Sequence, residues 1–293
     1  MSRHKTPLRY PGGKQKLSPF IVEILVANDL LGGQYAEPYA GGAGVAMDLL
    51  LGGHIERIHL NDSCVGVYSF WKSVRDNPET LCRKISRASL NVEEWRRQKA
   101  IIAQPECHDE LEIGFSLFFL NRVNRSGIVS GGLIGGLDQT GNWKMDARFN
   151  RNELINRVEA IAKNGKKIFL RNWDAERFLL DYVPKLPARS LIYCDPPYFN
   201  KADRLYLNHY TTSDHERIAK IIQRSVKHHW IVSYDGVQEI LALYGKRRSF
   251  LYNLQYNAAS AYKGTEAFFF SDKLCIPSDS TVAFISEALQ QAA

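Results

Sequence analysis

The chain of 293 residues is 45% hydrophobic and 24% charged, which is ordinary for a globular protein with one large domain or a core with an inserted smaller one. Its five cysteines are widely spaced without a Cys-x-x-Cys pair, so neither a disulfide framework nor a zinc site is expected. No apolar run approaches the roughly 20 residues that cross a bilayer, and the basic N-terminus lacks a signal-peptide core; a cytoplasmic protein without a membrane partner is predicted.

Positive charge is distributed unevenly along the chain, which has a formal net charge of +7 and a pI near 9.1. The first twenty residues contain five basic side chains and no acidic one, and residues 122–151 contain five basic side chains against two acidic ones. Local positive charge beside aromatic residues is typical of a protein that binds a phosphate backbone. A solubilising surface would give the same count, so charge alone does not decide.

The segment 6–14, Thr-Pro-Leu-Arg-Tyr-Pro-Gly-Gly-Lys, cannot be a helix or a central strand because prolines and paired glycines break both. The glycines let the backbone approach a ligand closely, and Lys14 places a cation there; the alternative is a flexible tail. Apolar residues recur at helical spacing from Leu17 to Leu25, which predicts a helix directly after this segment.

Residues 34–39 are predicted to form the first strand, followed by the glycine-rich turn Ala40–Gly44 and a helix over 45–51. Strand, glycine turn and helix make the nucleotide-binding opening of a doubly wound sheet, although the full Gly-x-Gly-x-x-Gly order and a Gly-Lys-Ser/Thr end are missing. A second strand over 55–60 ends at Asp62, which is placed for a ribose diol. The expected ligand is a nucleoside without a polyphosphate, such as an adenosyl group attached to methionine.

The middle of the chain, from about residue 78 to 163, lacks the sheet pattern. A helix over 65–74 precedes it, helices with basic faces are predicted over 81–85 and 95–102, and an apolar stretch over 114–121 is expected to pack onto the core. A glycine-rich, basic piece over 122–141 predicts a hairpin or mobile loop. Three side chains in it are of the types that read base edges in the major groove, although an ordinary loop with solvated charges is the alternative: Arg122, Asn124 and Arg125.

The sheet pattern resumes in the last third of the chain, with Asp174 after the third strand at the expected ligand edge. The remaining predicted strands are 167–171, 191–194, 230–233, 250–254 and 266–270. A helix over 214–226 is expected to begin with Ser213 as its N-cap, and another helix covers 237–244. Residues 199–212 are interpreted as a flexible cover for the site, and 258–264 as a hairpin loop.

The fourth strand runs directly into Asp195-Pro196-Pro197-Tyr198. Two prolines cannot continue a sheet because neither has a backbone N–H, so the chain leaves the sheet here. A flat aromatic amine could stack on Tyr198 while Asp195 and the Pro196 carbonyl accept its two amino hydrogens, which would aim the nitrogen lone pair at an electrophile. Taken alone, these four residues could equally be a surface turn.

Four motifs in one order carry a resemblance to a known family. They are Arg9-Tyr10-Pro11-Gly12-Gly13-Lys14, Glu37-Pro38-Tyr39-Ala40-Gly41-Gly42-Ala43-Gly44, Asn61-Asp62 and Asp195-Pro196-Pro197-Tyr198. Over nearly its whole length the chain resembles the Dam-like, D12 class of DNA adenine-N6 methyltransferases. The resemblance implies an α/β fold: a Rossmann-like, seven-stranded methyltransferase sheet in a catalytic domain of residues 1–76 and 165–293, with a mostly helical target-recognition domain inserted over 77–164.

The resemblance also assigns roles to individual residues. Tyr10 and Lys14 should contact the cofactor, S-adenosyl-L-methionine; Asp62 should hold its ribose; and Asp174 matches an acidic position facing its adenine. The full cofactor-binding set is Tyr10, Lys14, Glu37, Pro38, Tyr39, Gly41, Gly42, Gly44, Asp62, Asp174 and Asp195. The catalytic set is Asp195, Pro196, Pro197 and Tyr198, with Arg122, Asn124 and Arg125 on the DNA. The stretch from Asn124 to Ser130 lacks the aromatic-rich loop of GATC-specific members, so no recognition sequence is predicted.

The function implied is site-specific methyl transfer from the cofactor to the amino group of an adenine flipped out of double-stranded DNA. No metal is expected, because the sulfonium is already activated. Two alternatives stay open: methylation of another amine such as cytosine N4 or a side-chain amide, and an inactive DNA-binding protein on the same fold. A cognate restriction endonuclease, as in restriction–modification, and the oligomeric state are not decided by the sequence.

Overall fold

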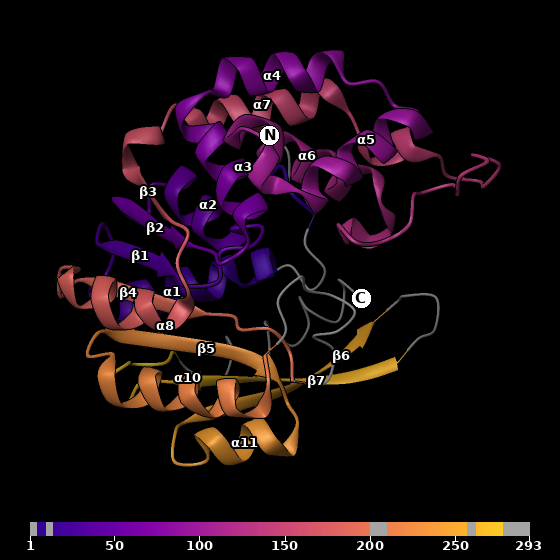
Figure 1. The fold of residues 1–293 in the computed structure, drawn as a ribbon. Helices are drawn as coiled ribbons and strands as arrows, with labels where there is room; N and C mark the ends of the chain where they lie inside the picture. The colour runs from indigo at the N-terminus through magenta and orange to yellow at the C-terminus, as the bar shows by residue number, and fades with distance from the viewer. Residues whose placement is uncertain (1–4, 10–13, 200–209, 257–261, 278–293) are drawn as a thin grey trace.

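The computed structural model describes residues 5–9, 14–199, 210–256 and 262–277, and its centre is one seven-stranded sheet (Figure 1). The strand order is β3-β2-β1-β4-β5-β7-β6. β7 pairs antiparallel with β5 and β6, whereas the other pairs are parallel. The strands are β1 Gln34–Glu37, β2 Arg57–Asn61, β3 Ile168–Arg171, β4 Ser190–Cys194, β5 His229–Asp235, β6 Ser249–Tyr256 and β7 Tyr262–Phe270. The predicted Rossmann-like, seven-stranded α/β fold is thereby confirmed.

Helices connect the strands and cover both faces of the sheet. They are η1 Lys14–Leu17, α1 Ser18–Ala27, α2 Gly44–Leu51, α3 Val65–Asp76, α4 Pro78–Arg87, α5 Val92–Ala103, α6 Glu110–Val123, α7 Arg151–Ala162, α8 Ala175–Arg177, η6 Phe178–Tyr182, α10 Thr212–Ser225 and α11 Gln238–Tyr244. The predicted N-cap of α10, Ser213, is wrong. Thr211 caps the helix, because its hydroxyl accepts from the N–H of Asp214 while the Asp214 carboxylate accepts from the N–H of Thr211.

The two faces of the sheet carry two separate hydrophobic clusters, as β4 shows. Leu191 and Tyr193 belong to the cluster with α1, α2 and α3, whereas Ile192 and Cys194 belong to the cluster with α8, α10 and α11. This alternation follows from the two-residue period of a strand. In Figure 1, α10 and α11 lie on the side of the sheet away from α3. Both faces are covered, which is why β4 is buried at every residue.

The inserted helices α4 to α7 share the core of the first face. Leu81 of α4, Phe118 of α6 and Leu154 of α7 are buried in the same cluster as Ile58 of β2. Figure 1 shows α4 and α7 side by side above α3. The segment 77–164 is mostly helical as expected, and it enlarges the sheet's core instead of forming a second one. Its role in target recognition stays a prediction.

The carboxyl ends of β1 and β4 lie next to each other at the point where the strand order reverses. The chain runs from β1 outward through β2 and β3, and then returns to place β4 and β5 on the other side of β1. Ala36 pairs with Ile192 across this boundary. Ligands bind at such a switch point because the two loops leave it in opposite directions. The glycine turn and the Asp195 segment both begin here.

Candidate active site

Asp195 is held at the end of β4 by its neighbour strand β5. The hydroxyl of Ser233 donates to Oδ1 of Asp195 at 2.5 Å, and Ser233 Oγ is itself 2.8 Å from the hydroxyl of Tyr193. The carboxylate is 28% exposed, so it is partly open to a ligand. Pro196 and Pro197 follow and take the chain away from the sheet, as predicted from their lack of a backbone N–H.

Lys14, Asp195, Tyr198 and Glu266 form one group of side chains, called here the active-site cluster. Lys14 Nζ donates to the Tyr198 hydroxyl at 3.0 Å and to Oε2 of Glu266, and the Tyr198 hydroxyl donates to Oε1 of Glu266. Lys14 Nζ also lies 3.7 Å from Oδ1 of Asp195 and 5.3 Å from the centroid of the Tyr198 ring. In this structure Lys14, predicted as a cofactor contact, lies among the residues predicted to be catalytic.

The pKa of Asp195 is raised above its ordinary value. Burial is the largest cause, the positive charge of Lys14 opposes it, and the negative charge of Glu266 adds to it. A carboxyl group in this setting holds a proton more tightly than a solvated aspartate. The cluster therefore tunes Asp195 with one cation and one anion of opposite effect.

The glycine turn after β1 adopts a backbone that few residue types accept. Gly41 has a φ of 44° and Ala43 a φ of 45°, both in the left-handed region, and α2 begins at Gly44. A Cβ on Gly44 would lie 3.1 Å from Cβ of Gln15, so the segment after Lys14 packs directly on the turn. The motifs at the N-terminus and after β1, far apart in sequence from Asp195, meet it at one edge.

Glu37 lies buried at the end of β1 and contacts the start of α2, next to the glycine turn. It is only 4% exposed, the hydroxyl of Tyr35 donates to it at 3.1 Å, and burial raises its pKa to about 8. The bond from Tyr35 and a bond from the backbone of Ala46 in the first turn of α2 oppose that rise. Glu37 was predicted to bind the cofactor; in this position its buried carboxyl group holds the start of α2.

Asp62 joins the end of β2 to the glycine turn. Its Oδ2 accepts from the N–H of Gly41 and its Oδ1 from the N–H of Cys64, each at 2.9 Å. Burial raises the pKa of Asp62 to about 6, and these two backbone bonds oppose the rise. The carboxylate thus lies beside the turn, where the sequence predicted a group for the ribose.

Three strand ends are connected by Asn61. Its amide nitrogen donates to the carbonyls of Pro38 and Trp173, each at 3.0 Å, and its amide oxygen accepts from the N–H of Trp173. Next to Trp173, the exposed Asp174 caps α8 by accepting from the N–H of Glu176 at 2.8 Å. Asp174 therefore lies at the predicted edge, with its carboxylate used by its own helix. Tyr39 OH is 3.0 Å from Tyr210 OH.

One predicted DNA contact needs correction. Asn124 is fully buried, its amide nitrogen donates to the carbonyls of Ile128 and Val129 at 2.9 Å, and its amide oxygen accepts from the indole N–H of Trp95 at 2.8 Å. Both amide hydrogens are used within the protein and the side chain is not exposed, so this amide does not reach a base edge in this structure. Asn124 instead closes the loop after α6, where an isolated antiparallel bridge pairs it with Leu133, as in a short hairpin.

The two arginines predicted to contact DNA differ in their exposure to solvent. Arg122 is half-buried, donates from Nε to the carbonyl of Arg148 at 2.6 Å, and has its pKa lowered to about 9 chiefly by burial. Arg125 is exposed. Arg125 is the most exposed of the three, while the half-buried Arg122 donates to backbone within the protein. The predicted cofactor contact Tyr10 lies outside the described residues.

The sequence was compared with known proteins. It matches the model of the D12 class N6 adenine-specific DNA methyltransferases over residues 10–259, which is most of the chain. The chain belongs to this family. No curated protein matches the sequence. The predicted family, the enzyme class and the reaction, S-adenosylmethionine-dependent methylation of DNA at adenine N6, are thereby confirmed.

Solved structures give a remote likeness only. Two structures of the rRNA methyltransferase aviRa from Streptomyces viridochromogenes reach TM-scores of 0.40 and 0.38 at 10% and 11% identity, covering 97% of this chain and 90% of that one. A protein from Legionella pneumophila reaches 0.36 at 12% identity, covering 97% and 92%. Likeness at this level carries no argument, so the methyltransferase is interpreted from its own residues.

Sequence reasoning on this D12 class methyltransferase missed Ser233 and Glu266. Ser233 lies inside an apolar strand and gave no signal. Glu266 gave a weak one, since it is an acid directly before the buried run Ala267–Phe270. Within the described parts of the chain, no helix is long and apolar enough to cross a membrane, and no three His, Cys, Asp or Glu side chains gather to hold a metal ion.

Proposed function

We propose that the D12 class methyltransferase binds its cofactor over the glycine turn and presents the target adenine to Asp195 and Tyr198. The observation that carries this proposal is the meeting of separate motifs at one sheet edge. Asp62 bonds to Gly41 in the glycine turn, and Lys14 lies 3.7 Å from Asp195. Two ligands bound at neighbouring strand ends would have their reacting atoms close together, which is the main requirement for transfer between them.

The residues around the glycine turn fit an adenosyl cofactor by their chemistry. The turn brings backbone close to the ligand without bulky side chains, and the Asp62 carboxylate can accept from two ribose hydroxyls. When bound, the cofactor supplies a methyl group on an electron-poor sulfonium. Glu37 would act indirectly here, because its buried carboxylate holds the start of α2 and hence the turn.

Asp195 would act on the amino group of the adenine. The nitrogen lone pair is delocalised into the base, and accepting the amino hydrogens on Asp195 favours a tetrahedral nitrogen with its lone pair directed outward. This interaction strengthens as the new bond forms, so it lowers the barrier instead of merely binding the base. Ser233 keeps the carboxylate in place through its 2.5 Å hydrogen bond.

Tyr198 supports the proposal that the base leaves the duplex. The side chain is only 6% exposed, so a base that stacks on it must enter the protein. An adenine within paired DNA cannot do so, because its amino group is bonded to the opposite strand. Flipping the nucleotide out resolves both constraints.

DNA contact is proposed for the basic surface of the inserted segment, 77–164. Arg125 is exposed at the end of α6, where Asn124 fixes the backbone beside it. An exposed guanidinium can pair with a phosphate or with the edge of a guanine. The resemblance leaves open whether a cognate restriction endonuclease accompanies the enzyme.

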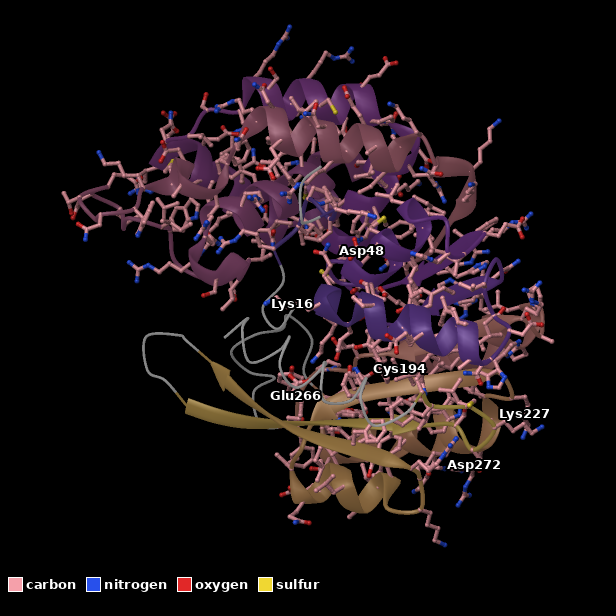
Figure 2. All side chains as sticks on the ribbon, turned by 180° about the vertical axis from the view of Figure 1, so that it is seen from behind. Lys16, Asp48, Cys194, Lys227, Glu266 and Asp272 are labelled. Atoms are coloured by element: carbon pink, nitrogen blue, oxygen red, sulfur yellow. The ribbon has the colours of Figure 1, made fainter. Side chains whose placement is uncertain are left out.

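The assignment of Asp195 is tested with two variants, Asp195→Ala and Asp195→Asn, and cofactor labelled in its methyl group. Methyl transfer to DNA should fall by at least about 10²-fold in both, because alanine removes the acceptor for the amino hydrogens and asparagine leaves only an uncharged amide oxygen in its place. DNA affinity, measured by fluorescence anisotropy, should change little. Asp272→Asn is the control, since Asp272 is an exposed acid at the opposite edge of the sheet (Figure 2). Transfer near the parent rate in the Asp195 variants would refute the catalytic role.

A further inference from the structure

A buried carboxylate on β7 connects two members of the active-site cluster. Glu266 is 2% exposed, and its two oxygens accept separately from Tyr198 and Lys14. These partners lie 68 and 252 residues away in the sequence. In Figure 2 Glu266 lies at one end of the sheet, and Lys227 and Asp272 lie at the opposite end.

Burial of the Glu266 charge lowers the stability of the fold. Glu266 pairs with Asp235 of β5 across the antiparallel ladder and directly precedes the buried run Ala267–Phe270. A buried carboxylate destabilises a fold unless its oxygens are paired, and an apolar residue of similar volume would often serve stability as well or better. Both oxygens of Glu266 are used on active-site groups, so stability alone does not account for an acid at this position.

We propose that Glu266 is a positioning residue for methyl transfer, which fixes the Tyr198 ring and keeps the ion pair between the Lys14 ammonium and Asp195 from closing further. This inference rests on the proposed roles of Asp195 and Tyr198. With Glu266 in place, Lys14 Nζ forms an ion pair with Asp195 Oδ1 at 3.7 Å, which is longer than a short charge-assisted hydrogen bond. Without it, the ammonium would close onto Asp195 and occupy an oxygen needed for the amino hydrogens.

Lys14 and Glu266 shift the pKa of Asp195 in opposite directions, so each substitution has an expected direction. Lys14 lowers the pKa of Asp195 and Glu266 raises it, after burial as the largest cause. The ionisable groups facing Asp195 are Lys14 from η1, Glu266 from β7, Glu37 and Tyr35 from β1, and Cys194 from β4. Lys14 is the cation of this set, so removing either Lys14 or Glu266 changes the balance in a known direction.

The experiment compares Glu266→Gln and Lys14→Met with the parent enzyme. In Glu266→Gln, kcat should fall by about 10²-fold, as expected for a displaced reacting group, with KM for DNA within twofold. The acid limb of kcat/KM against pH should move to lower pH, and in Lys14→Met it should move to higher pH. Glu239→Gln on α11 removes an exposed carboxylate of equal charge and should change neither quantity. A Glu266→Gln enzyme with parental kcat and an unmoved acid limb overturns the inference.

A second readout does not depend on activity. The titration of Asp195 is followed by carboxyl-carbon NMR in cofactor-free protein and assigned by its absence in Asp195→Asn. Opposite shifts of the Asp195 pKa in Glu266→Gln and Lys14→Met support the network. They would do so even if Asp195→Ala still methylated DNA, a result that would contradict only the proposed function. An unmoved titration in both variants overturns the inference.

Tyr198→Phe covers the case in which Glu266→Gln does not fold. The phenyl ring can still stack on a base, and only the hydroxyl that bonds Glu266 and Lys14 is removed. We expect kcat to fall about tenfold, and the loss should not add to that of Glu266→Gln where both can be measured. A Tyr198→Phe enzyme with parental kcat would contradict the positioning role.

Discussion

Asp62 shows how one side chain can serve both the fold and the ligand. Its two oxygens bond to the backbone of Gly41 and Cys64, which sets the distance between the glycine turn and β2. Each carboxylate oxygen has a second lone pair, so the same group can accept from a ribose. Burial raises its pKa to about 6, and the charge state of Asp62 therefore changes close to physiological pH.

Cofactor affinity should depend on the ionisation of Asp62. A carboxylate accepts from ribose hydroxyls and a neutral carboxyl accepts less well, so affinity should be full above the pKa and be lost as pH falls through about 6. Below that value the loss should approach tenfold per pH unit, as one proton is taken up. Titration calorimetry from pH 5 to 7.5 measures it. Asp62→Asn should bind weakly at every pH, and a flat parental profile would exclude Asp62 as the ribose acceptor.

At the scale of an element, the loop after α6 separates structural from DNA-binding side chains. Asn124→Ala leaves the indole of Trp95 and the carbonyls of Ile128 and Val129 without this amide, and should lower the free energy of unfolding by about 1–3 kcal/mol. Arg125→Ala should leave stability unchanged and reduce the slope of log affinity against log salt by about one. Urea unfolding and anisotropy in a salt series give both quantities. A large stability loss in Arg125→Ala would contradict this division.

Elements with strong local signals were predictable from the sequence. The apolar run 190–194 before two prolines and the glycine turn after β1 each determine their own conformation. The N-cap of α10 was not predictable, because Thr211, Thr212 and Ser213 can all cap a helix and the register of the helix decides among them. The glycines and basic residues of 122–141 predicted a hairpin or mobile loop, but no local signal marked Asn124 as the buried amide that closes it.

The candidate site was predictable as a set of motifs and not as a set of contacts. Asp195, Tyr198, Asp62 and the glycine turn stand in known relation to strand ends, so their meeting at one edge follows from the parallel sheet. The contact of Glu266 with Lys14 spans 252 residues and depends on β7 entering between β5 and β6 in the opposite direction. Local sequence carries no information about such a pairing.

For the whole molecule, the continuous core predicts that the inserted helices and the sheet unfold together. Leu154 of α7 is 1% exposed and shares its cluster with β1, β2 and β4. Leu154→Ala should therefore cost about 2–5 kcal/mol and shift one common transition, seen alike by tryptophan fluorescence and circular dichroism. Leu137→Ala, in the same segment but 55% exposed, is the control and should stay within about 0.5 kcal/mol. Two separate transitions would show that the insertion folds independently.

The distance along the chain between Lys14 and Glu266 has a consequence for synthesis. Glu266 is made 252 residues after Lys14, yet both contact the same tyrosine. A ribosome-bound chain can form β1 to β5 in order, but its reaction centre must wait until β7 has emerged from the exit tunnel. Incomplete chains are thus expected not to methylate DNA until β7 has joined the sheet.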